Sequence, residues 1–147
     1  MMFSLSQDPA IKYNSLKACH MSDRMDWKTD AEVYKALDAE FRFDFDPCPS
    51  NPQVDGLAVD WGSANFVNPP YGKEIGKWIQ KGYSEWLKGK TVVFLIPSRT
   101  DTQWWHNYIM KASEIRFVKG RLRFQGAKHN APFPSAIAIF QAPTDRP

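Results

Sequence analysis

Hydrophobic side chains recur along this chain with two different periods. Between residues 33 and 41 they are four apart, which predicts a helix over 28–41 that Thr29 or Asp30 caps. Phenylalanines then alternate with charged residues over 41–45, which is the period of a half-buried strand. The first third of the chain is therefore expected to contain a helix that leads into a strand.

The rest of the chain alternates between apolar runs and helical patterns. Short apolar runs predict buried strands over 56–61, at the start of 64–70, over 90–97 and over 135–141. Helical spacing predicts two further helices, over 73–89 and 101–113, and the alternation over 114–126 indicates a hairpin that turns near Gly120. Strands that alternate with helices and end in a hairpin predict an α/β sandwich.

Composition narrows the class of protein without deciding it. The 147 residues suffice for one domain, and 43% hydrophobic with 24% charged residues is ordinary for a globular protein. We expect an N-terminal extension over 1–25 and a single minimal domain over 26–147. A net charge of +3 permits a nucleic-acid partner without requiring one. The apolar runs are too short to span a bilayer, no signal pattern begins the chain, and the two cysteines lack zinc-ligand spacing, so we expect a cytoplasmic protein without a metal.

The stretch Asn-Pro-Pro-Tyr, from Asn68 to Tyr71, separates an apolar strand from a helix. Neither proline can donate a backbone hydrogen bond or continue a helix, and the residue before each is held extended, so this stretch is expected to be a rigid loop. In an open α/β sheet, ligands bind just beyond the carboxyl ends of the strands. The loop is therefore a candidate for ligand recognition. A double proline is, however, also common as a plain connection between a strand and a helix.

The exocyclic amino group of a purine is a reaction centre that suits this loop. Its lone pair is delocalised into the ring, so two acceptors aimed at its N–H bonds favour the tetrahedral nitrogen that a reaction requires. The side-chain oxygen of Asn68 and the carbonyl of Pro69 are such a pair, which Pro69 and Pro70 hold in position. Tyr71 is expected to stack on the purine face. No general base is essential, because the proton leaves after the nitrogen has become cationic.

Three stretches of the chain together resemble one known family. "FVNPPYG", "IPSRTDTQWWH" and "KGRLRF…APFPSAI" closely resemble the phage-type DNA adenine methyltransferases, the Dam-like enzymes of phages and prophages, and the resemblance covers residues 26–140. It implies methyl transfer from S-adenosyl-L-methionine to the exocyclic amino nitrogen of adenine at specific sites in DNA, in the cytoplasm of a bacterial host. It also implies a Rossmann-like methyltransferase fold with a mostly parallel sheet and a C-terminal antiparallel hairpin.

The cofactor contacts are less clearly marked, because the glycine-rich turn of the wider methyltransferase superfamily is absent from this sequence. The best substitute is the stretch 43–51, in which a predicted strand ends at Asp46. Its carboxylate suits the amino group of methionine or an adenosyl hydroxyl, although an aspartate before a proline is also a common turn former. The residues expected to bind the cofactor are Trp27, Thr29, Asp46, Pro47, Cys48, Asp60 and Asn68.

The residues expected to contact DNA come from two stretches. The first follows the predicted strand over 90–97 and supplies Arg99, Thr100, Asp101, Trp105 and His106. Arg99 suits a phosphate or a guanine edge, whereas Asp101 is equally suited to cap a helix. The second stretch supplies Lys119, Arg121 and Arg123, which alternate with apolar residues, so that a hairpin would present them on one face. The alternative for these three is a solvated sheet face.

Two other functions fit the same residues. One is the same chemistry on an amino nitrogen of a protein or an RNA, because Asn-Pro-Pro-Tyr also marks enzymes that methylate glutamine amides or rRNA. The other is a nucleic-acid-binding module that keeps the shape without the activity, which the missing glycine-rich turn favours. For the active enzyme we expect double-stranded DNA as the partner and a monomer or weak dimer as the assembly.

Overall fold

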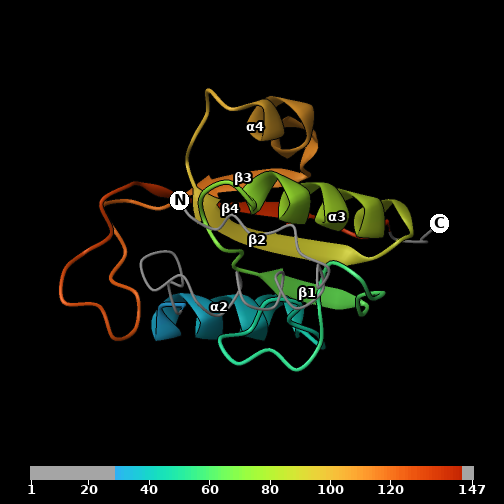
Figure 1. Ribbon diagram of the computed structural model, residues 1–147, viewed down its shortest axis with the longest axis horizontal. Coiled ribbons are helices and arrows are strands. Elements are labelled where there is room, and N and C mark those ends of the chain that lie inside the picture. The colour runs from blue at the N-terminus through green and yellow to red at the C-terminus, as the bar shows by residue number, and fades with distance from the viewer. Residues whose placement is uncertain (1–28, 144–147) are drawn as a thin grey trace, which may run out of the picture.

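A mixed sheet organises residues 29–143, the part of the chain that this computed structural model describes (Figure 1). Its four strands are β1 (Ala64–Val67), β2 (Thr91–Pro97), β3 (Glu114–Phe117) and β4 (Ser135–Phe140), in the order β1-β2-β4-β3. β1 and β2 are parallel, whereas β4 is antiparallel to both β2 and β3. The α/β class is confirmed. The prediction of a mostly parallel sheet was wrong, because β4 runs back between β2 and β3 and makes both of its pairings antiparallel.

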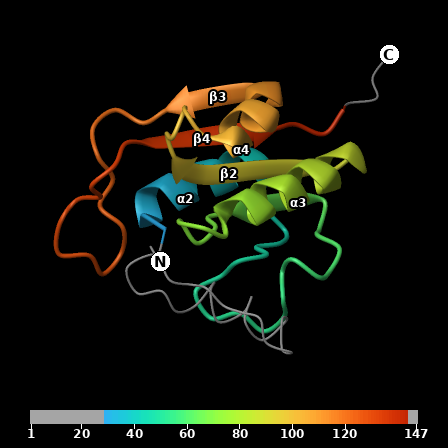
Figure 2. The ribbon, with the colours of Figure 1, turned by 45° about the horizontal axis from the view of Figure 1, so that its top comes forward.

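Helices cover both faces of this sheet (Figures 1 and 2). They are α2 (Ala31–Phe41) on one face, α3 (Ile75–Leu87) on the other, and the short α4 (Gln103–Asn107) and 3-10 helix η1 (Ile109–Lys111) beside α3. The first two confirm the predicted helices, and the Asp30 carboxylate caps α2 by accepting from two backbone N–H groups of its first turn. The third predicted helix breaks at Tyr108 into α4 and η1.

The core is closely packed where α3 crosses β2. Gly82 of α3 lies against the ring of Phe94 in β2, and a Cβ atom at this position would collide with that ring. Phe94 packs edge-on against Phe140 of β4, with ring centroids 5.9 Å apart. All seven residues of β2 are buried, as the unbroken apolar run predicts. The absence of a side chain at Gly82 thus allows α3 to lie directly on the sheet.

Two predicted strands before β1 are reduced or absent. The strand expected over 41–45 is a single parallel bridge, between Phe45 and Asn65 of β1. The stretch 56–61 forms turns rather than a strand. It folds back on itself because the indole N–H of Trp61 donates to the carbonyl of Gly56 at 2.7 Å. Trp61 is therefore buried, and Leu57 and Val59 are partly buried, without a sheet neighbour.

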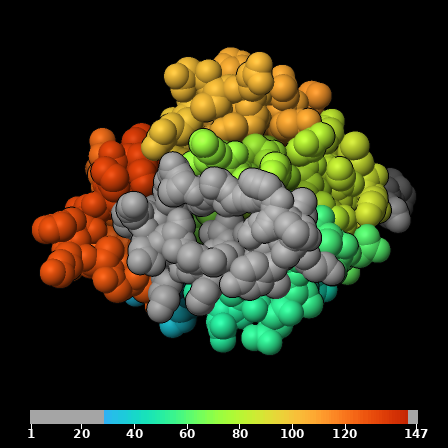
Figure 3. Space-filling view, in the orientation of Figure 1, coloured from blue at the N-terminus to red at the C-terminus, as the bar shows by residue number. Residues whose placement is uncertain are grey.

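A long connection, residues 118–134, joins β3 to β4 and projects from one end of the sheet (Figures 1 and 3). The hairpin predicted to turn near Gly120 was wrong, since β3 pairs with β4 and not with the residues that follow Gly120. Leu122 and Phe124 are nevertheless buried while their basic neighbours are exposed, so the predicted alternation holds within a loop. The backbone N–H of Ala131 donates to the carbonyl of Leu122 at 2.8 Å and ties the two halves of this loop together.

A buried carboxylate fixes the end of the sheet at which β2 begins. Glu85 of α3 is 0% exposed, and its carboxylate pairs with Lys81, Lys88 and Lys90 and accepts from the backbone N–H of Trp61. Burial by itself raises the pKa of Glu85, but these hydrogen bonds outweigh burial and lower the pKa to about 2. The carboxylate therefore joins α3, the residues before β1 and the start of β2.

We expect Glu85→Gln to lower the free energy of unfolding at pH 7 by about 3 kcal/mol, because the lysines lose their shared counter-charge. The pKa of Glu85 lies below its unfolded value, so its contribution is complete above pH 4.5 and is lost as the pH falls towards 2. The gap between the variant and the wild type should therefore narrow between pH 4.5 and pH 2. Urea denaturation across this pH range measures it.

Glu74→Gln is the matched control, because within residues 29–143 Glu74 pairs only with Lys77, whose side chain is 67% exposed. We expect this substitution to cost less than about 0.5 kcal/mol. An equal loss of stability in both variants would contradict a special role for Glu85.

Candidate active site

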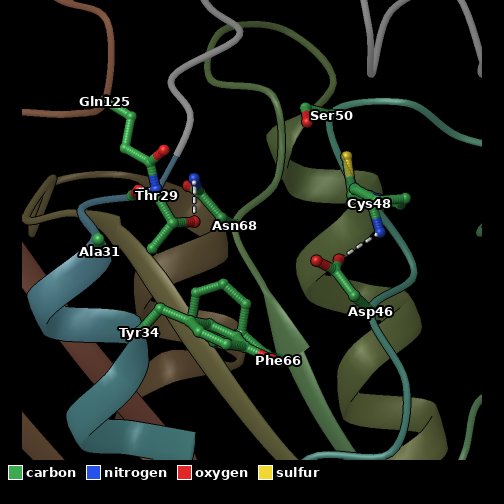
Figure 4. A pocket seen from close by; sticks show the side chains of 10 residues that line it. Thr29, Ala31, Tyr34, Asp46, Cys48, Ser50, Phe66, Asn68 and Gln125 are labelled. Atoms are coloured by element: carbon green, nitrogen blue, oxygen red, sulfur yellow. Dashed lines mark hydrogen bonds between the residues drawn. The ribbon is translucent and has the colours of Figure 1, made fainter.

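A cavity of about 340 Å³ opens at the carboxyl end of β1, beside the segment that bridges to it (Figure 4). It is lined by Thr29, Ala31, Tyr34, Asp46, Cys48, Pro49, Ser50, Phe66, Asn68 and Gln125. Its volume is in the range of small-molecule sites, and the carboxyl edge of an α/β sheet is where such sites form. The cavity is therefore the candidate active site.

One wall of the cavity carries a carboxylate in an unfavourable environment. The side chain of Asp46 accepts a hydrogen bond from the backbone N–H of Cys48 at 2.9 Å, which closes a tight turn after the bridge at Phe45 (Figure 4). Burial raises the pKa of Asp46 to about 6, and the bond from Cys48 opposes this shift without cancelling it. A ligand with a cationic group or a hydroxyl donor would relieve the cost of this buried charge.

The apolar part of the lining comes from two aromatic rings. Tyr34 of α2 and Phe66 of β1 pack edge-to-face with their centroids 5.1 Å apart, and both side chains face the cavity (Figure 4). Thr29 and Ala31, at the amino end of α2, line the cavity as well. The backbone N–H groups at a helix amino end favour an anionic ligand group there. Carboxylate, aromatic and helix-end groups thus surround one space.

Asn68 is held by hydrogen bonds at both ends of its amide. Its Nδ2 donates to the hydroxyl of Thr29 at 3.1 Å (Figure 4), and its Oδ1 accepts from the hydroxyl of Tyr71 at 3.0 Å. The Tyr71 hydroxyl also lies 3.3 Å from the carbonyl of Leu95. An amide oxygen has two lone pairs and can accept two hydrogen bonds. The amide is held from both of its ends at the wall of the cavity.

The structure gives Tyr71 a different position from the one that stacking requires. Its side chain is 4% exposed and its ring packs edge-on against Phe133, with centroids 5.2 Å apart. Burial raises the pKa of Tyr71, so the hydroxyl stays protonated and can donate to Asn68. In this conformation the ring belongs to the core and not to the cavity wall. The stacking role is corrected accordingly.

The other predicted cofactor contacts divide into two groups. Thr29, Asp46, Cys48 and Asn68 meet in the cavity, whereas Pro47 is buried beside it and is not part of its lining. Asp60 is 82% exposed and pairs with Lys88 at the end of α3, on the opposite edge of the sheet. It misses the cavity because the stretch 56–61 forms turns instead of the strand expected to deliver it. Trp27 lies outside the described residues.

The first group of predicted DNA contacts lies beyond the carboxyl end of β2. Arg99, Thr100 and Asp101 are exposed there, and Thr102, which like Asp101 was a candidate cap for this helix, caps α4. His106 is also exposed, and its Nε2 lies 2.7 Å from the carbonyl of Thr100.

Trp105 departs from the prediction that it contacts DNA. Its side chain is 2% exposed, so it packs in the core, while the neighbouring Trp104 is only half-buried. Adjacent helical positions face different directions, and here the core takes Trp105. The choice between the two tryptophans was thus wrong for this conformation.

The second group lies on the connection 118–134. Lys119, Arg121 and Arg123 are exposed, and Arg123 donates to the carbonyl of Ala127 at 3.3 Å. By contrast, the guanidinium of Arg116 on β3 forms bidentate bonds of 2.8 Å with Glu40. Basic side chains on this connection are therefore presented to solvent, whereas the one on the neighbouring strand is paired.

Several cavity residues were not among the individual site residues predicted from the sequence. They are Ala31, Tyr34, Pro49, Ser50, Phe66 and Gln125. Tyr34 lies one turn after the Asp30 cap, and Phe66 lies two residues before the Asn-Pro-Pro-Tyr loop, so their positions offer a weak local signal. Gln125 has none, because it is 57 residues beyond Asn68 and reaches the cavity only through the fold of the connection 118–134.

Two general features of residues 29–143 limit the kinds of site. Within this range, no group of three or more histidine, cysteine or acidic side chains is arranged to hold a metal ion. The helices of the same range are too short or too polar to cross a membrane.

These features define an α/β protein with a small-molecule cavity at the carboxyl edge of its sheet and a rigid amide-bearing loop in the cavity wall. Residues 17–143 match the family described as DNA N-6-adenine-methyltransferase (Dam), and the chain belongs to that family. It is also similar to the DNA N-6-adenine-methyltransferase of Haemophilus phage HP1 (strain HP1c1), with 27% identity over 110 residues. The match covers 66% of this chain and 64% of that protein, so the chain spans less than two thirds of that relative.

Burial of Asp46 predicts an unusual dependence of stability on pH. Because its folded pKa of about 6 is above the ordinary 3.8, ionisation opposes folding, and the cost grows as the pH rises from 3.8 to 6. Asp46→Asn keeps the acceptor for Cys48. We expect it to raise the free energy of unfolding at pH 7.5 by up to about 3 kcal/mol, as measured by urea denaturation. The gap should close towards pH 4.

Asp60→Asn provides the comparison, because Asp60 is exposed and its replacement should change stability by less than about 0.5 kcal/mol. A stability gap for Asp46→Asn that does not depend on pH would show that burial does not disfavour its charge.

Proposed function

We propose that this protein transfers a methyl group from S-adenosyl-L-methionine to the exocyclic amino nitrogen of adenine in DNA. The observation that carries the proposal is the position of Asn68, the first residue of Asn-Pro-Pro-Tyr, in the wall of the cavity at the carboxyl end of β1. Family membership supports the same reaction. The geometry therefore joins a loop suited to planar amino nitrogens with a space suited to a small cofactor.

The lining of the cavity fits S-adenosyl-L-methionine in its chemistry. Asp46 offers an anionic acceptor to an ammonium group or a ribose hydroxyl, and Tyr34 and Phe66 offer apolar surface to an adenine ring. When bound, the cofactor supplies a methyl group on a positively charged sulfur. The turn closed by Asp46 and Cys48 would then replace the missing glycine-rich turn.

The contribution of Asn68 is to make the amino nitrogen of the target base a better nucleophile. Its Oδ1 and the carbonyl of Pro69 would accept from the two N–H bonds, which favours a tetrahedral nitrogen whose lone pair is no longer shared with the ring. The two prolines keep both acceptors in place before the base arrives, so little free energy is spent on reorganisation. The proton can leave to water afterwards, because the methylated nitrogen is cationic and acidic.

The surface expected to hold DNA lies on the same side of the sheet. Arg99 to Asp101 follow β2 at its carboxyl end, as Asn68 follows β1. Lys119, Arg121 and Arg123 project from the connection 118–134, which reaches the cavity at Gln125. Basic residues on this connection would bind phosphates and position the duplex, leaving the reacting nitrogen to Asn68.

We expect Asn68→Ala to lower methyl transfer at least about 100-fold, equivalent to roughly 3 kcal/mol of transition-state stabilisation. Its fold should survive, because Asn68 lies on a loop and its truncation opens no core cavity. Asn68→Asp keeps an acceptor oxygen and should be milder. The assay is transfer of a labelled methyl group to unmethylated DNA, with nucleoside analysis of the product.

Calorimetry with S-adenosyl-L-methionine provides the control for these variants. Asn68→Ala should retain most of the cofactor affinity, whereas Asp46→Asn should lose affinity because its charge is gone. Wild-type turnover in folded Asn68→Ala would rule out the mechanism. If the labelled methyl group appears in protein or RNA and not in DNA, the same chemistry acts on a different substrate. If the wild-type protein binds DNA but not the cofactor, it is a nucleic-acid-binding module without the activity.

The salt dependence of DNA binding tests the role of the connection 118–134. Lys119→Ala combined with Arg121→Ala should weaken binding and reduce the slope of log affinity against log salt by about one for each lost phosphate contact. Turnover at saturating DNA should remain, because these residues position the duplex only. Lys35→Ala with Lys77→Ala removes equal charge from exposed helical positions and should leave the slope unchanged. Equal slopes in both double variants would place the DNA elsewhere.

A further inference from the structure

We propose that the connection 118–134 sets the orientation of the Asn68 amide, and that Gln125 is a positioning residue for methyl transfer. The inference rests on the proposed function, since it assigns to the connection that is expected to bind DNA a second role, which is to position the Asn68 amide. Two independent series of contacts lead from this connection to the two ends of the Asn68 amide. One series passes through Thr29 to the amide nitrogen, and the other passes through Tyr71 to the amide oxygen.

The first series of contacts passes through Thr29. The side-chain Nε2 of Gln125 donates to the backbone carbonyl of Thr29 at 2.7 Å. The hydroxyl of Thr29 in turn accepts from Nδ2 of Asn68 at 3.1 Å (Figure 4). Thr29 directly precedes Asp30, the cap of α2, so the helix restrains it on its other side. Gln125 therefore fixes the residue that receives the amide nitrogen.

The second series of contacts passes through Tyr71. The ring of Phe133, near the end of the same connection, packs edge-on against the ring of Tyr71 at 5.2 Å. Phe133 is itself buried and packs against Phe124 of the same connection, which restrains its ring. The Tyr71 hydroxyl then donates to Oδ1 of Asn68 at 3.0 Å. This series fixes the position of the residue that contacts the amide oxygen, and the Leu95 carbonyl is a second acceptor for the same hydroxyl proton.

Orientation matters because the two ends of a carboxamide have almost the same shape and opposite hydrogen-bonding character. The proposed chemistry needs an acceptor towards the amino nitrogen, whereas a rotated amide would present N–H donors in its place. Thr29 and Tyr71 contact the two ends of the amide from different elements, so their positions hold the amide with Nδ2 towards Thr29 and Oδ1 towards Tyr71. Loss of either neighbour therefore affects the reaction more than it affects binding.

The connection 118–134 is also the part of the protein best suited to sense DNA. It carries Lys119, Arg121, Arg123 and Lys128 and has no acidic residue. Gln125 follows Arg123 by two residues, so phosphate contacts on this connection lie next to the bond that holds Thr29. The residues proposed to bind phosphates and the residue that holds Thr29 therefore belong to one connection.

The kinetic test compares two substitutions of similar length at Gln125. Gln125→Met removes the donor to Thr29, and we expect kcat at saturating DNA and cofactor to fall roughly three- to tenfold with the KM for DNA within twofold of wild type. The Kd of S-adenosyl-L-methionine is measured in parallel, because Gln125 also lines the cavity proposed to bind it. Gln125→Lys restores a donor and should recover most of kcat. Gln80→Met is the matched control, because Gln80 is an exposed glutamine on α3. It should leave all three constants unchanged.

A second measurement does not depend on methyl transfer. The side-chain NH₂ resonances of Asn68, assigned by their loss in Asn68→Ala, report the environment of the amide directly. We expect them to move towards solvent-exposed values in Gln125→Met and to stay in place in Gln80→Met. If wild-type protein fails to methylate DNA, the proposed function fails, and these resonances still decide whether Gln125 controls the amide.

The proposal is overturned by either of two results. One is a folded Gln125→Met variant with wild-type kcat or with unshifted Asn68 resonances. The other is a Gln125→Lys variant as slow as Gln125→Met, because donation to Thr29 would then not be the cause. Combining Gln125→Met with Tyr71→Phe should lower kcat by less than the product of the two separate effects, since both act through Asn68. Fully multiplicative effects would contradict a shared target.

Discussion

The hydrogen bonds on the two ends of the Asn68 amide are the constraint on which the site depends. They require Thr29 from the start of α2, Tyr71 from the proline loop and the carboxyl end of β1 to meet within about one side-chain length. The sheet supplies the common platform, because parallel strands end at the same edge. The double proline stops β1 there and turns the chain towards α3. The amide is thus placed by elements that are far apart in sequence.

Two buried carboxylates illustrate how the same sheet separates stability from function. Glu85, where β2 begins, has three lysine partners, and its lowered pKa shows that its charge is compensated. Asp46, at the cavity, has a backbone N–H and a raised pKa, so its charge is poorly compensated by the described residues. Compensation is complete where the chain must be held together. It is incomplete where a ligand with a cationic group is proposed to supply the rest.

The sequence predicted the elements of the fold better than their pairing. Periodicity located α2 and α3 and the buried strands β1, β2 and β4, because helices and buried strands impose their spacing locally. It failed over 56–61, where an apolar run folds into turns around Trp61, and over 114–126, where the partner of β3 proved to be β4. Apolar character indicates burial, but which strand lies alongside depends on the whole sheet.

For the site, the sequence by itself determined the chemistry: an amide on a rigid loop, a carboxylate at the end of an extended segment and a basic stretch near the C-terminus. Only the tertiary structure decided which of these groups meet. It brought Asp46 and Thr29 to Asn68, left Asp60 on the opposite edge of the sheet, and turned the Tyr71 ring into the core. It also brought in Gln125, which no local pattern marks. The reason is physical: residue type and local spacing fix what a side chain can do, whereas its neighbours across the sheet fix where it does so.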